Sequence, residues 1–175
     1  MFEKFNGFVG LNNGIGFDSL EDFTLSTNGK TFLNGMYRFF KTAEIEKWCK
    51  IVEEAFPQYK NQISVFAFDW LGRIFALRRN TEKVLLFEPG TGEVLDIAVD
   101  IVAFHEEEIV DYNDDSLASS FFYEWFEAND NYILKHNECA GYKVPLFLNG
   151  DDALDNLEVS DMEVYWGIMT PLMNL

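Results

Sequence analysis

The sequence predicts an α+β fold in which an antiparallel β-meander packs with several helices in a single compact domain. Closely spaced strand patterns between residues 63 and 99 are separated by short turns that contain glycine, as is typical of antiparallel hairpins. Residues 45–55 repeat apolar side chains at helical spacing. The chain has 175 residues, is 48% hydrophobic and contains 18 Phe, which is enough to fill the core of one domain.

The N-terminal part is expected to be the least regular. Residues 1–31 are predicted to form a loop-rich extension, because Gly and Asn are frequent between residues 6 and 30, with one short helix near residues 18–23. Residues 35–40 match a strand. In the helix that follows, Thr42 is the expected N-cap and Pro57 limits the C-terminal end. Cys49 lies on the apolar stripe of that helix, so we expect a buried, unreactive thiol.

The predicted meander consists of four strands joined by short turns. Its four strands are expected at residues 63–68, 73–77, 83–87 and 93–99. The first pair flanks Asp69-Trp70-Leu71-Gly72 and the second flanks Glu88-Pro89-Gly90-Thr91-Gly92. Glycine in each connection can adopt positive φ, as a tight turn requires.

Acidic helical segments are expected after the meander. They cover residues 100–112 and 117–128, and Ser116 is the expected cap of the second. Ser160 and Glu163 have capping-box spacing before the apolar run at residues 164–173. We interpret this run as a helix interrupted near Pro171, although its β-branched and aromatic start also suits a strand.

The charge of the chain is strongly negative and unevenly distributed. Its net charge is −17, from 13 Lys and Arg against 30 Asp and Glu. Residues 1–99 contain 13 acidic and 11 basic residues, whereas residues 100–175 contain 17 acidic residues and only two basic ones, Lys135 and Lys143. Such an acidic surface repels nucleic acid and anionic membranes and attracts basic partners. The simplest alternative is that the charge serves solubility alone.

Composition also bears on the compartment. The apolar runs are far too short to span a bilayer, and the N-terminus lacks the basic and then apolar regions of a signal peptide. Two cysteines, Cys49 and Cys139, form neither a disulfide framework nor a zinc spacing. We therefore expect a cytoplasmic protein that binds neither membrane nor nucleic acid.

No metal-binding motif in the sequence is complete. Asp111, Asn113 and Asp115 resemble the start of an EF-hand loop, but Ser116 and Phe122 occupy the positions that need Gly and Glu. The stretch of Glu residues after His105 lacks the second His of the zinc-protease motif. We expect no metal and no other cofactor.

Catalytic motifs are incomplete as well. Cys139 lies three residues from His136, but the neighbouring Glu138 does not lower the pKa of a thiol. The Gly-rich segment at residues 10–16 matches neither the P-loop nor the dinucleotide-binding fingerprint. We therefore expect a binding protein and not an enzyme. Hydrolysis by paired carboxylates stays open, since 30 acidic residues offer many pairs.

Several blocks of the sequence resemble a known family. These blocks are Asn34-Gly35-Met36-Tyr37-Arg38 followed by Trp48, the stretch from Phe68 to Leu77, the stretch from Phe87 to Glu93, the stretch from Glu138 to Leu148, Asn156-Leu157-Glu158, and Asp161-Met162-Glu163-Val164-Tyr165-Trp166. In order and spacing they resemble the C-terminal domain of type VI secretion immunity proteins, long catalogued as a domain of unknown function. Members of this class neutralise DNase effectors. The resemblance implies an immunity-type α+β domain at residues 32–175.

The resemblance and the charge together lead to a functional hypothesis. We expect a cytoplasmic immunity-type protein that binds a basic protein toxin, a nuclease, through an acidic surface. The residues expected to form that surface are Glu106, Glu107, Asp111, Asp114, Asp115, Asp151 and Asp152. The aromatic residues of the shared blocks are expected in the core, and Asp69 is expected to cap its turn or pair with Arg73. A carboxylate-based hydrolase and a regulatory or scaffold module without a toxin partner are the alternatives.

Overall fold

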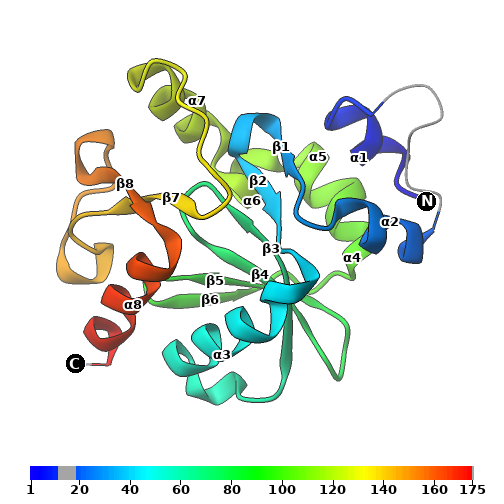
Figure 1. The fold of residues 1–175 in the computed structure, drawn as a ribbon, viewed down its shortest axis with the longest axis horizontal. Helices are drawn as coiled ribbons and strands as arrows, with labels where there is room; N and C mark the ends of the chain where they lie inside the picture. The colour runs from blue at the N-terminus through cyan, green and yellow to red at the C-terminus, as the bar shows by residue number, and fades with distance from the viewer. Residues whose placement is uncertain (12–18, 175) are drawn as a thin grey trace.

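The computed structural model describes residues 1–11 and 19–174 and has the predicted α+β fold. Its strands are β1 (Thr31–Phe32), β2 (Tyr37–Phe39), β3 (Ile63–Asp69), β4 (Ile74–Arg78), β5 (Val84–Glu88), β6 (Glu93–Asp96), β7 (Glu138–Tyr142) and β8 (Leu157–Asp161). The first six form one antiparallel sheet in sequence order, and β7 pairs with β8 in a second sheet (Figure 1). The predicted meander is therefore confirmed as β3 to β6, and β1 and β2 extend it.

Helices fill the rest of the fold. They are α1 (Glu3–Phe8), α2 (Leu20–Thr27), α3 (Ile45–Ala55), α4 (Ile101–Ala103), the π-helical turn η4 (Phe104–Glu108), α5 (Ile109–Asp111), α6 (Asn113–Leu117), α7 (Ser119–Ala128) and α8 (Met162–Met173). Short 3₁₀ turns are η1 (Leu33–Gly35), η2 (Thr42–Glu44), η3 (Pro57–Tyr59), η5 (Leu146–Leu148) and η6 (Leu154–Asn156).

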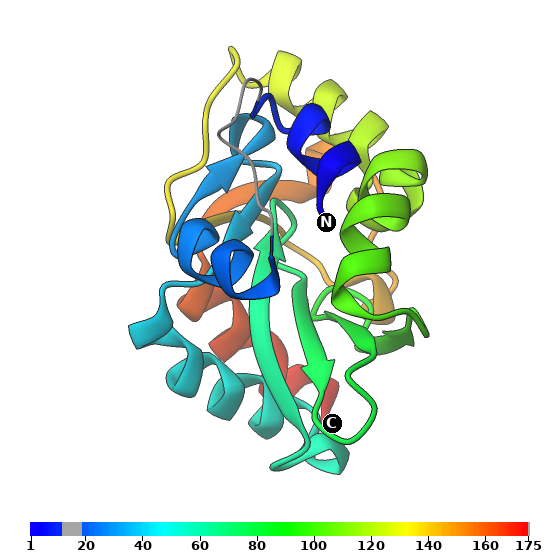
Figure 2. The same cartoon turned by 90° about the vertical axis from the view of Figure 1, so that its right-hand side faces the viewer.

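The inner strands of the large sheet, β2 to β5, are buried on both faces. Side chains alternate along a strand, so Phe75 of β4 enters one hydrophobic cluster while Ile74 and Ala76 enter the other. The helices α3 and α8 pack on the second face, and the helical run from α4 to α7 covers the first (Figure 2). Because these strands are buried on both faces, their sequences are nearly continuous runs of apolar residues.

The turn between β3 and β4 is organised by one carboxylate. Asp69 is fully buried, and its Oδ1 accepts hydrogen bonds from the backbone N–H of Leu71 and of Arg73 at 3.0 Å each. Gly72 adopts φ +76° in the same turn, a conformation that favours glycine. The predicted turn-capping role of Asp69 is confirmed, as is the burial of Trp70 and Phe75.

The N-terminal segment is more regular than expected. The helix α1 was not predicted, and α2 extends four residues beyond the expected end at residue 23. Asp18, where the expected helix begins, lies outside the described residues. Phe2, Phe5 and Phe23 are almost fully buried beside Tyr37 and Phe39. The segment therefore contributes aromatic side chains to the core, a role that its Gly and Asn content hid.

Three predicted caps were wrong. Thr42 lies inside η2 and does not cap α3. Ser116 lies inside α6, and α7 starts instead after Ala118 in the left-handed conformation, with Asp114 accepting a hydrogen bond from Ser120 N–H. The cap of α8 is Asp161, not Ser160, because the Asp161 side chain accepts hydrogen bonds from the N–H groups of Glu163 and Val164.

The last helix and the second sheet also refine the prediction. Residues 162–173 are one helix and not a strand, and Pro171 lies within its last turn without ending it. The pairing of β7 with β8 was not predicted, since their short strands contain Gly141 and several charged residues. The β7 strand joins the main sheet through the hydrogen bond from Ala140 N–H to the carbonyl oxygen of Trp70 at 2.7 Å.

Candidate functional site

The seven predicted contact residues lie on two segments. Glu106, Glu107 and Asp111 follow one another along η4 and α5, Asp114 and Asp115 belong to α6, and Asp151 and Asp152 precede η6. All except the half-buried Glu106 are exposed. The structure thus places six of the seven carboxylates at the surface.

Several of these acids already make internal contacts. Glu106 accepts hydrogen bonds from the N–H groups of Lys4 and Phe5 at the start of α1, where the helix dipole favours a negative charge. Asp111 forms an ion pair with Lys4 at 2.8 Å. Asp114 caps α7, and the hydrogen bonds from Ser120 hold its pKa below the usual range. These three residues have structural roles that sequence could not separate from binding.

Most acids of the C-terminal portion remain unneutralised. Within the described residues, only Asp111, Glu138 and Glu163 of the 17 carboxylates between residues 100 and 175 take part in an ion pair. Glu107, Asp115 and Asp151 are exposed, and none of the hydrogen bonds or ion pairs of the described residues involves their side chains. Their charge is therefore available to an external cation.

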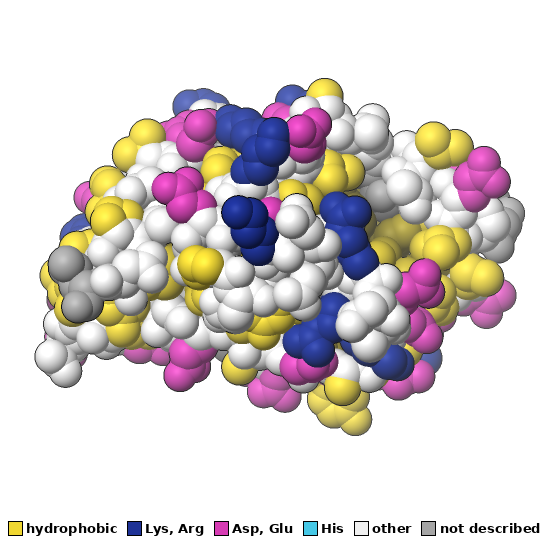
Figure 3. All heavy atoms as spheres, turned by 90° about the horizontal axis from the view of Figure 1, so that it is seen from below, with side chains coloured by type: hydrophobic (Ala, Val, Ile, Leu, Met, Phe, Trp, Pro, Cys, Tyr) yellow, Lys and Arg dark blue, Asp and Glu magenta, His cyan; other side chains and the backbone are white. Residues whose placement is uncertain are grey.

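Basic side chains gather on another face. Figure 3 shows several Lys and Arg side chains, with Asp and Glu among them, on the face seen from below, where α3 lies. Lys47 and Lys50 of α3 pair with Glu163 and Glu46 respectively. This face is mixed in sign, in contrast with the unpaired acids of the C-terminal portion.

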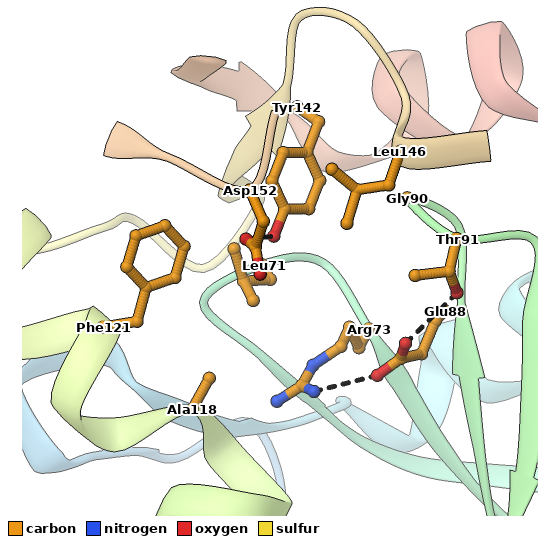
Figure 4. Close-up of a pocket in the computed structure, with 10 residues that line it drawn as sticks. All are labelled: Leu71, Arg73, Glu88, Gly90, Thr91, Ala118, Phe121, Tyr142, Leu146 and Asp152. Carbon is orange, nitrogen blue, oxygen red and sulfur yellow. Dashed lines mark hydrogen bonds and ion pairs between the residues drawn. The ribbon is translucent and has the colours of Figure 1, made fainter. Parts of the chain in front are cut away.

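One concave feature with converging polar groups is a pocket of about 220 Å³. It lies where the β3–β4 turn, the β5–β6 turn, the α6–α7 junction and the segment after β7 meet (Figure 4). Its apolar wall consists of Leu71, Ala118, Phe121 and Leu146. Asp152 is the one predicted contact residue that lines it.

An ion network forms the floor of the pocket. Arg73 binds Asp69 through Nε at 2.6 Å and Glu88 through Nη1 at 2.9 Å, and its Nη2 donates to the carbonyl oxygen of Ser116. Burial raises the pKa of Asp69, while Arg73 opposes that shift. The second oxygen of Glu88 accepts a hydrogen bond from Thr91. The predicted pairing of Asp69 with Arg73 is confirmed, and Glu88 is an additional partner.

The other side of the pocket carries a tyrosine and an aspartate. The Tyr142 hydroxyl donates to Asp152 Oδ1 at 2.6 Å, and burial together with this bond raises the tyrosine pKa. Gly90 lies against the Tyr142 ring, where an added Cβ would come within 2.6 Å of it. Glycine at this position therefore lets the β5–β6 turn approach the tyrosine closely.

Sequence reasoning could not find this pocket. Its walls come from segments centred on residues 72, 90, 120 and 147, which the fold brings together only in space. The motif blocks contained Arg73, Glu88 and Tyr142, but their proximity was not visible in the sequence. No local pattern marks Phe121 as a pocket residue, because it belongs to the apolar face of α7.

The surroundings of Cys139 and His136 bear on catalysis by a thiol. Cys139 is buried, and burial raises the pKa of its thiol to about 12, which disfavours the reactive thiolate. His136 pairs with Glu44 at 2.9 Å.

Among the described residues, no three His, Cys, Asp or Glu side chains gather as metal ligands would, and no described helix has the length and apolar character to cross a membrane.

Comparison with known proteins gives a fold and no function. The sequence matches no family profile and no curated protein. A solved structure, the crystal structure of Atu4351 from Agrobacterium tumefaciens, is similar with a TM-score of 0.62 and 15% identity. The alignment covers 97% of this chain and 88% of that chain. The likeness therefore extends over the whole α+β architecture, and at this identity it shows the fold alone.

Proposed function

We propose that this protein is an immunity-type protein that binds and neutralises a basic protein toxin, a nuclease effector, in the cytoplasm. The proposal rests on the family resemblance of residues 32–175 and on one structural observation. That observation is the excess of carboxylates after residue 100, most of them exposed, of which only three are neutralised by ion pairs within the described residues.

The physical basis is charge complementarity. A nuclease needs a basic surface to hold phosphate groups, and an acidic protein surface can occupy that surface in place of nucleic acid. Long-range attraction between such surfaces speeds association, and salt screens it. The mixed charge of the face that includes α3 makes that face a poorer partner for a basic toxin.

Co-purification tests the proposal directly. The product of a neighbouring toxin gene, inactivated in its catalytic residues, is co-expressed with this protein and purified at low salt through a tag on the toxin. We expect a stable complex, and we expect this protein to restore growth to cells that express the active toxin. Absence of a complex at low salt, together with absence of growth protection, would contradict the proposal.

The hydrolase alternative draws on one observation. Glu88 and Asp152 line the same pocket, as a carboxylate pair would. However, both oxygens of Glu88 already accept hydrogen bonds from Arg73 and Thr91, so this carboxylate is committed to the structure. The arrangement of Glu88 therefore favours binding over catalysis.

The other alternative is a scaffold role without a toxin. A gene neighbourhood that encodes no toxin would indicate that role.

A further inference from the structure

The pocket whose floor is formed by Arg73 and its two carboxylate partners is small and has both polar and apolar walls. Its volume of about 220 Å³ lies below the roughly 300–1,000 Å³ typical of sites for drug-sized ligands. A single long side chain matches this volume better than a nucleotide or a sugar chain does. Figure 4 shows Asp152 and the Tyr142 hydroxyl next to Leu71, with Phe121 on one side of the pocket and Arg73 on the other.

The charge around the pocket favours a cationic occupant. Among the described residues that line the pocket, Arg73 is the one cation, and it is bound by two carboxylates, Asp69 and Glu88. Asp152 adds a third carboxylate, so the site carries net negative charge. Within the described residues, the Asp152 carboxylate accepts one hydrogen bond, which the Tyr142 hydroxyl donates to Oδ1. The other oxygen, Oδ2, can therefore accept a hydrogen bond from a ligand.

The aromatic walls point to the kind of cation. A planar guanidinium stacks on aromatic rings and donates to a carboxylate in the same plane, whereas an ammonium is more strongly hydrated. Phe121 and Tyr142 supply the rings, and Leu71 and Leu146 supply apolar surface for an alkyl chain. We propose that this pocket receives one arginine side chain of the partner protein, with Asp152 as the residue that recognises the guanidinium.

This inference rests on the proposed function, which requires a basic partner, and it extends that function by naming a recognition pocket. It also adds a point of specificity to the diffuse attraction of the acidic surface. Buried or partly enclosed arginine residues are common hot spots at protein interfaces. A partner that presents an arginine at the correct position would therefore bind more tightly than another basic protein of equal charge.

A titration of the isolated protein tests the pocket without the toxin. The probe is N-acetyl-L-arginine amide, and the readout is the backbone NMR shifts of Leu71, Thr91 and Ala118. We expect saturable shifts at these residues, weaker shifts with the lysine analogue, and none with the uncharged citrulline analogue. Equal shifts with the citrulline or lysine analogue, no shifts with arginine, or shifts with inorganic phosphate instead would overturn the inference.

Two neighbouring aspartates give a matched pair of variants. Asp152→Asn keeps the shape of the side chain and its bond with Tyr142 but removes the charge, and Asp151→Asn removes a charge outside the pocket lining. We expect Asp152→Asn to raise the Kd of the arginine probe about fivefold, as for a partly exposed ion pair, and Asp151→Asn to leave it unchanged. Phe121→Leu, which removes an aromatic ring, should also raise the Kd of the probe. Equal effects of the two Asn variants would contradict the assignment.

The same variants separate this inference from the proposed function. If the toxin binds and Asp152→Asn weakens its complex no more than Asp151→Asn does, the pocket assignment fails while the proposed function stands. If no toxin complex forms and growth is not protected, the proposed function fails, and the arginine titration still decides whether the pocket recognises a guanidinium.

Discussion

At the scale of single residues, buried polar groups hold together segments that are distant in sequence. Arg38 is fully buried and donates hydrogen bonds to the carbonyl oxygens of Lys135, Glu138 and Asp69. Burial lowers its pKa to about 10, so it stays charged at neutral pH. Arg73 makes a similar bridge from the β3–β4 turn to Glu88 and to Ser116. Removing one member of such a network leaves a buried charge without its partner.

The buried pair of Asp69 and Arg73 should matter far more than an exposed pair of the same spacing. Asp69→Asn removes the charge opposite Arg73, and we expect it to lower the free energy of unfolding by about 3 kcal/mol. Glu46→Gln breaks the exposed pair with Lys50 and should lower stability much less, because solvent and salt screen an exposed pair. Urea denaturation of both variants measures the difference. Similar small losses would show that the network contributes little to stability.

His105 should make the protein sensitive to acid. Its ring is fully buried, Nε2 lies 2.9 Å from the Tyr37 hydroxyl, and Nδ1 lies 2.7 Å from the carbonyl oxygen of Ile101. Burial lowers the pKa of His105 to about 3, and the Ile101 contact opposes this shift. Between about pH 6.5, the unfolded value, and about pH 3, the unfolded state binds a proton that the folded state does not. Stability should therefore fall as the pH falls through this range.

The slope of stability against pH isolates this effect. One proton corresponds to about 1.4 kcal/mol per pH unit, and His105→Gln should reduce the slope by up to that amount between about pH 6 and pH 4. Loss of packing in the variant shifts the whole curve without changing its slope, and the carboxylates titrate in both proteins. Denaturant unfolding at a series of pH values gives both slopes. Equal slopes would mean that His105 does not stay neutral in the fold.

At the scale of elements, the sequence predicted what depends on local pattern. The meander was found because its strands are apolar and its turns contain glycine, and α3 was found from its apolar stripe. The N-caps lie one or two residues after the predicted positions, at Asp161, Ala118 and Glu44. The β7–β8 pair was missed because its pairing is long-range, between residues 138–142 and 157–161. The π-helical turn at η4, which brings both Phe104 and His105 into the core, has no local signal that we recognise.

The cap of α8 offers a direct check at this scale. Asp161→Ala removes the acceptor of two backbone N–H groups and should lower stability by about 1 kcal/mol. Ser160→Ala, which would have had that effect if Ser160 were the cap, should change stability by less than about 0.5 kcal/mol. Thermal or urea unfolding of the two variants compares them. A larger loss for Ser160→Ala would contradict the cap seen in the structure.

At the scale of the whole molecule, charge asymmetry is the property most readable from sequence. Counting residues predicted that the excess of negative charge lies after residue 100, and the structure adds that few of those carboxylates are neutralised by ion pairs among the described residues. The sequence could not predict the pocket, because Arg73, Phe121 and Asp152 converge only through the tertiary fold. It also could not show that Glu106, Asp111 and Asp114 serve the fold itself.

Under the proposed function, the exposed acids of residues 100–175 attract a basic toxin. Its most direct test compares two triple charge reversals that change the net charge equally. One set is Glu107→Lys, Asp115→Lys and Asp151→Lys. The control set is Glu54→Lys, Glu82→Lys and Glu93→Lys, three exposed acids before residue 100 that form no ion pair with a described residue.

The measurement is the association rate of the inactivated toxin with each protein at low and at physiological salt. We expect the first set to slow association at least tenfold at low salt and to flatten its dependence on salt, because steering depends on local potential. The control set should change the rate much less. Equal slowing by both sets would contradict a localised acidic surface, and an unchanged rate in both would contradict electrostatic recognition of the toxin.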